Sequence, residues 1–475
     1  MRKAALLPVL LLAAVPAWAQ TPAAPPPSGP AAGSPASAPI SVPAPPTVDD
    51  PMLVAVPPPK RVLTSWQEAV GLLRSRSTDL RIALDQVLQA EAATRIALAQ
   101  YLPSIVGTGI FTHQLITKAA TGFGSIIIGT GGVLTSARVP TENTTIGQIQ
   151  LQQDVINAQE FDQISINELS EDAARLSVDD EKRTLALSVA NQIVAVVTAE
   201  RAAEINRVGL RVALEQAEIT LRKRALGAAN GLDVVRAQQN AANARATLVT
   251  GDESLHEARE ALGLALGIAE EVGVSPAVDV GGLAKDAAGT CRVVPTVDDR
   301  ADVAAARTQL EVAKRNLRNV WYTFIPTVTA QSTVAAVSPS GAYPNPTWNV
   351  QGVLSVPIWD GGTRYGNLRN ARAAQDIATQ QLEALKRQAI IQVEQAQRQM
   401  LVAEQSAKVA REQRDLAAQN DQMTQLGYMT GQGSSLELVT ASEAHRQAEL
   451  NLALLDFDVV KARLLAILAL ATCPW

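Results

Sequence analysis

The chain has 475 residues and a net charge of −5, and 47% of its residues are hydrophobic but only 3% are aromatic. Ala supplies most of the hydrophobic content, which favours long helices packed through small side chains over a compact enzyme core. The acidic balance argues against a nucleic-acid surface, because such a surface needs a basic stripe.

The N-terminus has the pattern of a secretory signal peptide. Arg2 and Lys3 precede an apolar stretch, and Ala17-Trp18-Ala19 matches the small-x-small cleavage pattern. We predict a signal peptide over residues 1–19, because the alternative, an anchor helix, needs a longer apolar stretch to cross a bilayer. Residues 20–60 contain 14 of the 26 prolines. This composition predicts a disordered lead-in that serves as a spacer.

The rest of the chain contains an internal duplication. Asp79 in "TDLRIALDQVLQAEAATRIALAQYLPSIVGTG" matches Asp302 in "ADVAAARTQLEVAKRNLRNVWYTFIPTVTAQS", 223 positions later, whereas the turn at Gly227 matches that at Gly431, 204 positions later. The offset falls because the first copy holds a loop insertion, "TGFGSIIIGTGGVLTSARVPTE". We predict two structural repeats, with these bounds: the first over 61–270, an inter-repeat segment over 271–299 and the second over 300–475.

Each repeat is predicted to run through an entering helix, two strands joined by a loop, a very long helix, a Gly-rich turn and a shorter returning helix. A long helix of about 64 residues spans roughly 95 Å, so the returning helix at 232–266 and the entering helix at 300–324, stacked end to end, can flank it. A stripe of small and apolar residues from Ala378 to Ala410, spaced three or four apart, predicts coiled-coil packing. A soluble coiled-coil rod is the alternative. The predicted helices are 65–101, 160–226, 232–266, 300–324, 364–427 and 436–470, and the predicted strands are 103–114, 145–157, 325–337 and 347–359.

The four strands alternate between apolar and polar residues. In "WNVQGVLSVPIWDGG" Trp348, Val350 and Leu354 share one parity, while Asn349 and Gln351 share the other. Strands of this length can cross a bilayer, with one face toward lipid and one toward water. A spanning sheet must close, and four strands cannot close alone, so several chains must pool their strands. A soluble four-stranded cap is the alternative.

The ordered set of features resembles the TolC-like outer membrane efflux protein family over residues 62–472. It comprises the signal peptide, the duplicated plan, "YLPSI" and "FIPTV", "VPIWDGG", and the two Gly-x4-Leu-[Asp/Glu] turns. The resemblance implies a mainly α fold with membrane strands. In the family, a homotrimer forms a 12-stranded outer-membrane β-barrel and a periplasmic α-barrel. The resemblance also implies a passive exit duct, embedded in outer-membrane lipid, for a tripartite efflux pump or type I secretion system. Its partners would be a periplasmic adaptor and, indirectly, an inner-membrane transporter.

The resemblance places the working residues at the two turns farthest from the membrane. Gly227 and Gly431 end the long helices, and Asp233 and Glu437 match the acidic position of the turn motif. Repeated around a pore, these acids would form rings that hold cations; their alternative role is to cap helix N-termini. Tyr428 is predicted to hydrogen-bond Asp233 of a neighbouring helical column and to hold the tip closed.

Other candidate residues have structural roles. Gly361 and Gly362 are predicted to form a hinge between strand and helix. Cys291 and Cys473 either form a disulfide, which the periplasm permits, or remain two thiols. The three histidines show no metal-ligand spacing, and no catalytic constellation, cofactor motif or metal motif is apparent. We therefore expect no enzyme. A structural tether through the periplasm, without transport, is the alternative function.

Overall fold

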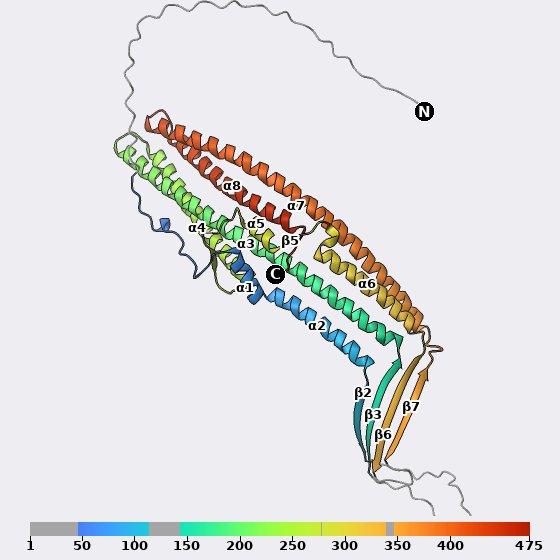
Figure 1. The fold of residues 1–475 in the computed structure, drawn as a ribbon. Coiled ribbons are helices and arrows are strands. Elements are labelled where there is room, and N and C mark those ends of the chain that lie inside the picture. The colour runs from blue at the N-terminus through green and yellow to red at the C-terminus, as the bar shows by residue number, and fades with distance from the viewer. Residues whose placement is uncertain (1–45, 114–142, 277, 339–345) are drawn as a thin grey trace, which may run out of the picture. The chain divides into compact units, whose positions relative to one another are not determined.

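The computed structural model describes residues 46–113, 143–276, 278–338 and 346–475. The predicted signal peptide, most of the lead-in and the whole loop insertion lie outside these residues. Within them, the two repeats share the predicted order of helices and strands (Figure 1).

The first repeat is built on α3 (Ala158–Ala225), which has 68 residues and is therefore about 100 Å long. It packs against α2 (Thr78–Tyr101) over one part of its length and against α4 (Gly231–Ala265) over another. Two short helices therefore lie along one long helix, but the pair is α2 with α4, whereas helix length predicted 232–266 with 300–324. The predicted entering helix is divided, because Ser77 leaves helical geometry after α1 (Trp66–Arg76) and its side chain then caps α2 by accepting from the Leu80 N–H.

The second repeat has the same plan around α7 (Thr363–Met429), which α6 (Ala301–Tyr322) and α8 (Ser435–Leu468) flank. The predicted stripe on α7 faces inward, since Leu382, Ala389, Ala396, Ala407 and Ala410 are all buried. The repeats are joined through α3, which also contacts α6 and α8. In the described part of the chain, none of the helices is both long enough and apolar enough to span a membrane.

Four antiparallel strands form one sheet in the order β2-β3-β6-β7. Their bounds are Ser104–Thr112, Thr144–Ile156, Thr327–Ser338 and Thr347–Ser355. The register places Ile149 opposite Val334, and Val334 opposite Trp348. These apolar residues share one face, whereas Gln152, Gln331 and Gln351 form a row on the other, with the Gln351 side chain donating to Gln331 at 2.9 Å. The predicted two-faced sheet is therefore present.

The largest buried cluster lies where the short helices meet beside the middle of α3. It includes Trp66, whose indole N–H donates to Thr290 at 3.0 Å, together with Val189, Leu262 and Leu464. The predicted irregular segment between the repeats supplies short elements here, namely β4 (Val272–Val274), α5 (Leu283–Thr290), β5 (Arg292–Val293) and the 3-10 turn η2 (Val297–Asp299). The core therefore sits at mid-length of α3, away from both the strands and the turns.

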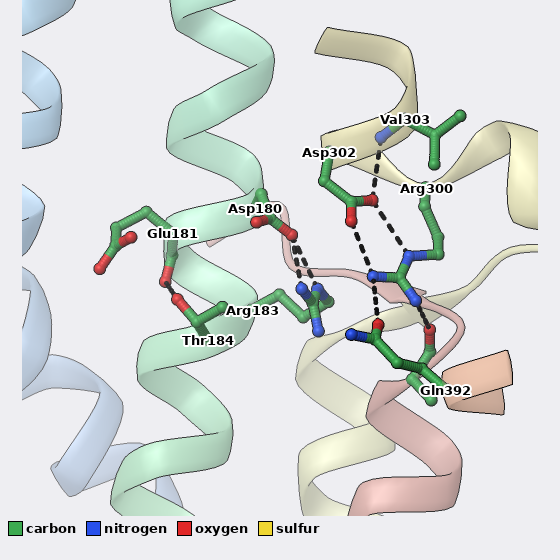
Figure 2. Close-up of polar contacts among 9 residues, drawn as sticks. Asp180, Glu181, Arg183, Thr184, Arg300, Asp302, Val303 and Gln392 are labelled. Atoms are coloured by element: carbon green, nitrogen blue, oxygen red, sulfur yellow. Dashed lines mark hydrogen bonds and ion pairs between the residues drawn. The ribbon is translucent and has the colours of Figure 1, made fainter. Parts of the chain in front are cut away.

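Polar contacts hold the start of α6 to the end of α8 at the same level. Arg300 is 3% exposed, and its guanidinium donates to Asp302, to the Gln392 side chain at 3.3 Å and to the Ala469 carbonyl at 3.1 Å (Figure 2). On α3 in the same view, Arg183 donates to Asp180 at 2.6 Å. A buried guanidinium whose donors are satisfied in this way fixes the register of three helices.

The last part of the predicted disordered lead-in is packed against the helices, which corrects that prediction for residues 46–60. A 3-10 turn, η1 (Pro51–Leu53), places Met52 and Leu53 against Leu210 and Leu248. Further on, β1 (Arg61–Leu63) pairs in parallel with β4. The segment follows α4 (Figure 1) because a Pro-rich chain still contains enough apolar residues here to use a groove between two helices.

Candidate functional site

The two turns between long and returning helices are built alike. Gly227 and Gly431 have φ values of +74° and +80°, a conformation that L side chains rarely adopt, so glycine is required at both helix ends. Each returning helix then starts with a reciprocal capping box. Asn230 pairs with Asp233 in the first repeat, and Ser434 pairs with Glu437 in the second. Both predicted acids thus hold the geometry of a turn.

Two contacts connect the first turn to the second. Lys223 donates from Nζ to the Tyr428 carbonyl at 2.9 Å, and the same Nζ lies 3.5 Å from the centroid of the Tyr428 ring. Ser435 donates from its hydroxyl to the Asp233 carboxylate. A cation over an aromatic ring is stabilised most when it is desolvated, and Tyr428 is only 8% exposed.

These contacts also set the charge state of the groups. The hydrogen bond from Ser435 lowers the pKa of Asp233 below its ordinary value. The backbone N–H of Ser434 lowers the pKa of Glu437. Both carboxylates therefore stay ionised at neutral pH. Burial lowers the pKa of Lys223, because desolvation disfavours its charged form.

The predicted hydrogen bond between Tyr428 and Asp233 is not formed within the chain. Asp233 is engaged by Ser435, and the Tyr428 hydroxyl is buried without a hydrogen-bond partner among the described residues. A bond to a neighbouring copy remains a prediction. Sequence reasoning missed Lys223 and Ser435. Ser435 occupies the position that Gly231 has in the first repeat, so a comparison of the two turns could have identified it as a difference between them. Lys223 is one of three consecutive basic residues at a helix end, and the sequence does not distinguish it from the other two.

The strand-to-helix connection before α7 contains the predicted glycine pair. Gly361 and Gly362 have φ values of +71° and +92°. Asp360, which the sequence reasoning did not single out, accepts from the Gly362 and Arg364 backbone N–H groups at 3.1 and 3.0 Å. The connection is therefore a capped turn whose two glycines are required by backbone geometry.

Cys291 and Cys473 are bonded to each other, with their Cα atoms 4.1 Å apart. Beside this bond, β8 (Ala471–Thr472) pairs with β5, so the C-terminus is attached at the level of the core. Of the histidines, His256 contacts the Glu271 carboxylate and His445 contacts the buried carboxylate of Asp421. The described residues contain no group of three or more His, Cys, Asp or Glu side chains that could hold a metal ion.

Fold and turns together are those of the TolC-like channel fold. The solved outer membrane protein VceC of Vibrio cholerae is similar, with 18% identity and a TM-score of 0.69 over 85% of this chain and 95% of that one. The open-state MtrE outer membrane channel of Neisseria gonorrhoeae has 18% identity and a TM-score of 0.68 over 85% of this chain and 88% of that one. At this identity the likeness concerns the fold.

Comparison with known sequences gives the family. The family model described as "Outer membrane efflux protein" matches residues 69–268 and 296–469, so the chain belongs to the outer membrane efflux protein family. Nodulation protein T of Rhizobium leguminosarum bv. trifolii is 25% identical over 405 residues, covering 82% of this chain and 81% of that protein. The matched residues include both turns, so the candidate site lies inside the family region.

Proposed function

We propose that three copies of this chain form the exit duct of a tripartite efflux pump or type I secretion system. The observation that carries this proposal is the four-stranded sheet, whose apolar face is open to solvent in the single chain. Ile105, Trp348 and Val350 on that face are 69%, 75% and 71% exposed. So large an apolar surface on one face of a sheet matches a lipid contact.

Closure of the sheet explains why copies must associate. In the described chain β2 and β7 each pair with a single strand, so each presents an open edge. Open edges are not tolerated in lipid, and they are satisfied when the β7 of one copy pairs with the β2 of the next. Three copies pool twelve strands, the number that the family resemblance implies, and their helices form a periplasmic barrel of twelve columns.

The turns form the gate of this duct. The chain supplies no driving force of its own, so an inner-membrane transporter acts through a periplasmic adaptor that docks at the turns. The Lys223–Tyr428 and Asp233–Ser435 contacts hold the two turns of one copy together, which corresponds to a closed tip. Three copies of Asp233 and Glu437 around the axis give the cation-binding rings. Export through a cleaved signal peptide delivers the chain to the outer membrane.

Mass and conductance test this assembly. We expect light scattering on the detergent-extracted protein to give three chain masses after correction for detergent, and planar bilayers to show channels. Val350→Asp places a charge on the apolar face in each of the three copies and should abolish insertion, because a charge on the lipid face is destabilising. Gln351→Glu is the matched control on the polar face and should insert. A stable monomer without conductance would instead favour a structural tether.

A further inference from the structure

The packed segment before β1 falls into two parts that are held differently. Residues 57–63 are firmly attached, since the Pro57 carbonyl accepts from Arg259 at 3.0 Å and Leu63 is 1% exposed within the β1–β4 pair. Residues 47–53, which we name the strap, are held by fewer groups. Within the described part of the chain, their only polar contact to the helices is with Arg245, whose guanidinium donates to the Asp50 carboxylate at 2.8 and 3.1 Å.

The strap lies in the groove between α3 and α4 without filling it. Met52 and Leu53 contact the cluster of Leu210, Ala241, Ala244 and Leu248, yet none of the residues of η1 is fully buried. A cavity of about 670 Å³ remains between Thr47–Asp50 and the two helices. The Asp50 side chain is 9% exposed, but the Arg245 side chain that pairs with it is 45% exposed. An ion pair with one partner open to water is screened and contributes little to stability. The strap is therefore seated weakly.

The length of the strap matches its course along α4. Arg245 and Arg259 are 14 residues apart, which is about 21 Å in a helix. Asp50 and Pro57, their respective partners, are seven residues apart, and with the 3-10 turn at Pro51–Leu53 this stretch spans roughly 19 Å. The strap thus runs from the firm anchor at the core toward the turn at Gly227 with little slack.

The corresponding groove of the second repeat lacks the residues that bind the strap. At the offset of 204 positions, Arg245 corresponds to Glu449, so Asp50 would face a like charge. In the apolar cluster, Leu210 corresponds to Arg414 and Ala241 to His445. The two helical hairpins are otherwise duplicated, so the groove that recognises an acidic residue followed by two apolar side chains is specific to the first repeat.

We propose that the α3–α4 groove is a peptide-docking surface that the strap occupies in cis, and that the strap is displaceable. Its ligand is a segment with a carboxylate placed for Arg245 and two apolar side chains placed for Leu210 and Leu248. Because the groove leads toward the turn, a helix of the periplasmic adaptor that uses this groove must first displace the strap. This last step rests on the proposed function, whereas the docking surface itself does not.

The strap peptide in trans tests the docking surface. The probe is a fluorescein-labelled synthetic peptide of residues 46–60, measured by anisotropy against the purified full chain in detergent. The strap-released variant carries Asp50→Arg, Met52→Ser and Leu53→Ser, so that its groove is vacant. A tethered segment has an effective concentration in the millimolar range, so the titration extends to about 1 mM. We expect binding to the released variant that is at least tenfold tighter than to the wild type.

Charge reversal provides the matched control. A peptide with Asp50→Arg should fail on the released variant. It should bind a chain with Arg245→Glu whose own strap carries Asp50→Ser, Met52→Ser and Leu53→Ser, so that the strap cannot form the reversed pair. Equal binding to wild type and released variant would overturn occupancy of the groove by the strap. Absence of binding to the released variant would overturn the docking surface. Conductance of the same preparations is measured separately, because a chain that forms no channel contradicts the proposed function without changing the peptide result.

Discussion

The ammonium group of Lys223 lies over the ring of Tyr428, 3.5 Å from its centroid, although the two residues are 205 positions apart. The contact joins the last turn of α3 to the last turn of α7. In the proposed duct, these are the two points at which a helical column would move outward when the tip opens. The contact therefore couples the two turns of one copy.

Removal of the Lys223 charge should loosen the tip. Lys223→Gln loses both the cation–π contact and the charge-assisted bond to the Tyr428 carbonyl, which together contribute about 1–2 kcal/mol. We expect single-channel conductance in planar bilayers to rise severalfold. Lys223→Arg is the control and should keep the closed conductance, because a guanidinium also binds an aromatic face.

Substitutions of Tyr428 distinguish two models of the contact that keeps the tip closed. Its hydroxyl has no partner among the described residues of the chain. If the ring alone holds Lys223, Tyr428→Phe should conduct like the wild type and Tyr428→Leu should conduct more. If the hydroxyl bonds Asp233 of a neighbouring copy, Tyr428→Phe should also conduct more. Conductance of the Phe variant thus decides whether the contact that keeps the tip closed lies within one copy or between copies.

The acidic rings should appear in ion selectivity. Asp233→Asn keeps a side-chain acceptor for the Asn230 N–H but removes three charges from an assembled trimer. We expect the reversal potential in a salt gradient to shift toward reduced cation preference. Ser435→Ala removes the hydrogen bond that the Asp233 carboxylate accepts but leaves the negative charge of Asp233 in place. The ion selectivity of this variant should therefore match that of the wild type. Unchanged selectivity in Asp233→Asn would leave the capping box as the role of this acid.

Local features of this fold were predictable, while contacts between distant segments were not. The Gly turns and the capping acids recur in both repeats at short spacing, and the strand faces follow from two-residue alternation. The break at Ser77 was missed, because helical periodicity continues across it. The binding of the strap to its groove depends on Arg245 and Leu248, nearly 200 positions away in the sequence. The composition of the strap alone predicted a disordered segment. Lys223 was missed for the same reason, since its partner is on the other repeat.

The start of α3 should make stability depend on pH. Burial, together with the nearby Asp154 carboxylate, raises the pKa of Glu160 to about 7. A raised pKa means that the folded protein holds this proton more tightly than the unfolded chain does. The stability that the protonated Glu160 carboxyl contributes is therefore complete below the ordinary pKa of 4.5 and is lost as pH rises through about 7. Glu160→Gln should therefore raise the melting temperature at pH 8 and leave it nearly unchanged at pH 5. Glu168→Gln, at an exposed position on the same helix, is the control. An equal gain at both pH values would contradict the ionisation argument.

The bond between Cys291 and Cys473 closes a loop of 182 positions and lies in the main buried cluster. Its loss increases the freedom of the unfolded chain, for which typical values are about 2–4 kcal/mol. We expect Cys291→Ser with Cys473→Ser to lower the melting temperature and to make β8 more accessible to protease, because the two-residue pairing of β8 with β5 then loses its covalent support. Each single variant should lose as much stability as the double variant, since either one abolishes the bond. Additive losses would mean instead that the cysteines act through packing at separate positions, and the disulfide would not be the source of the stability.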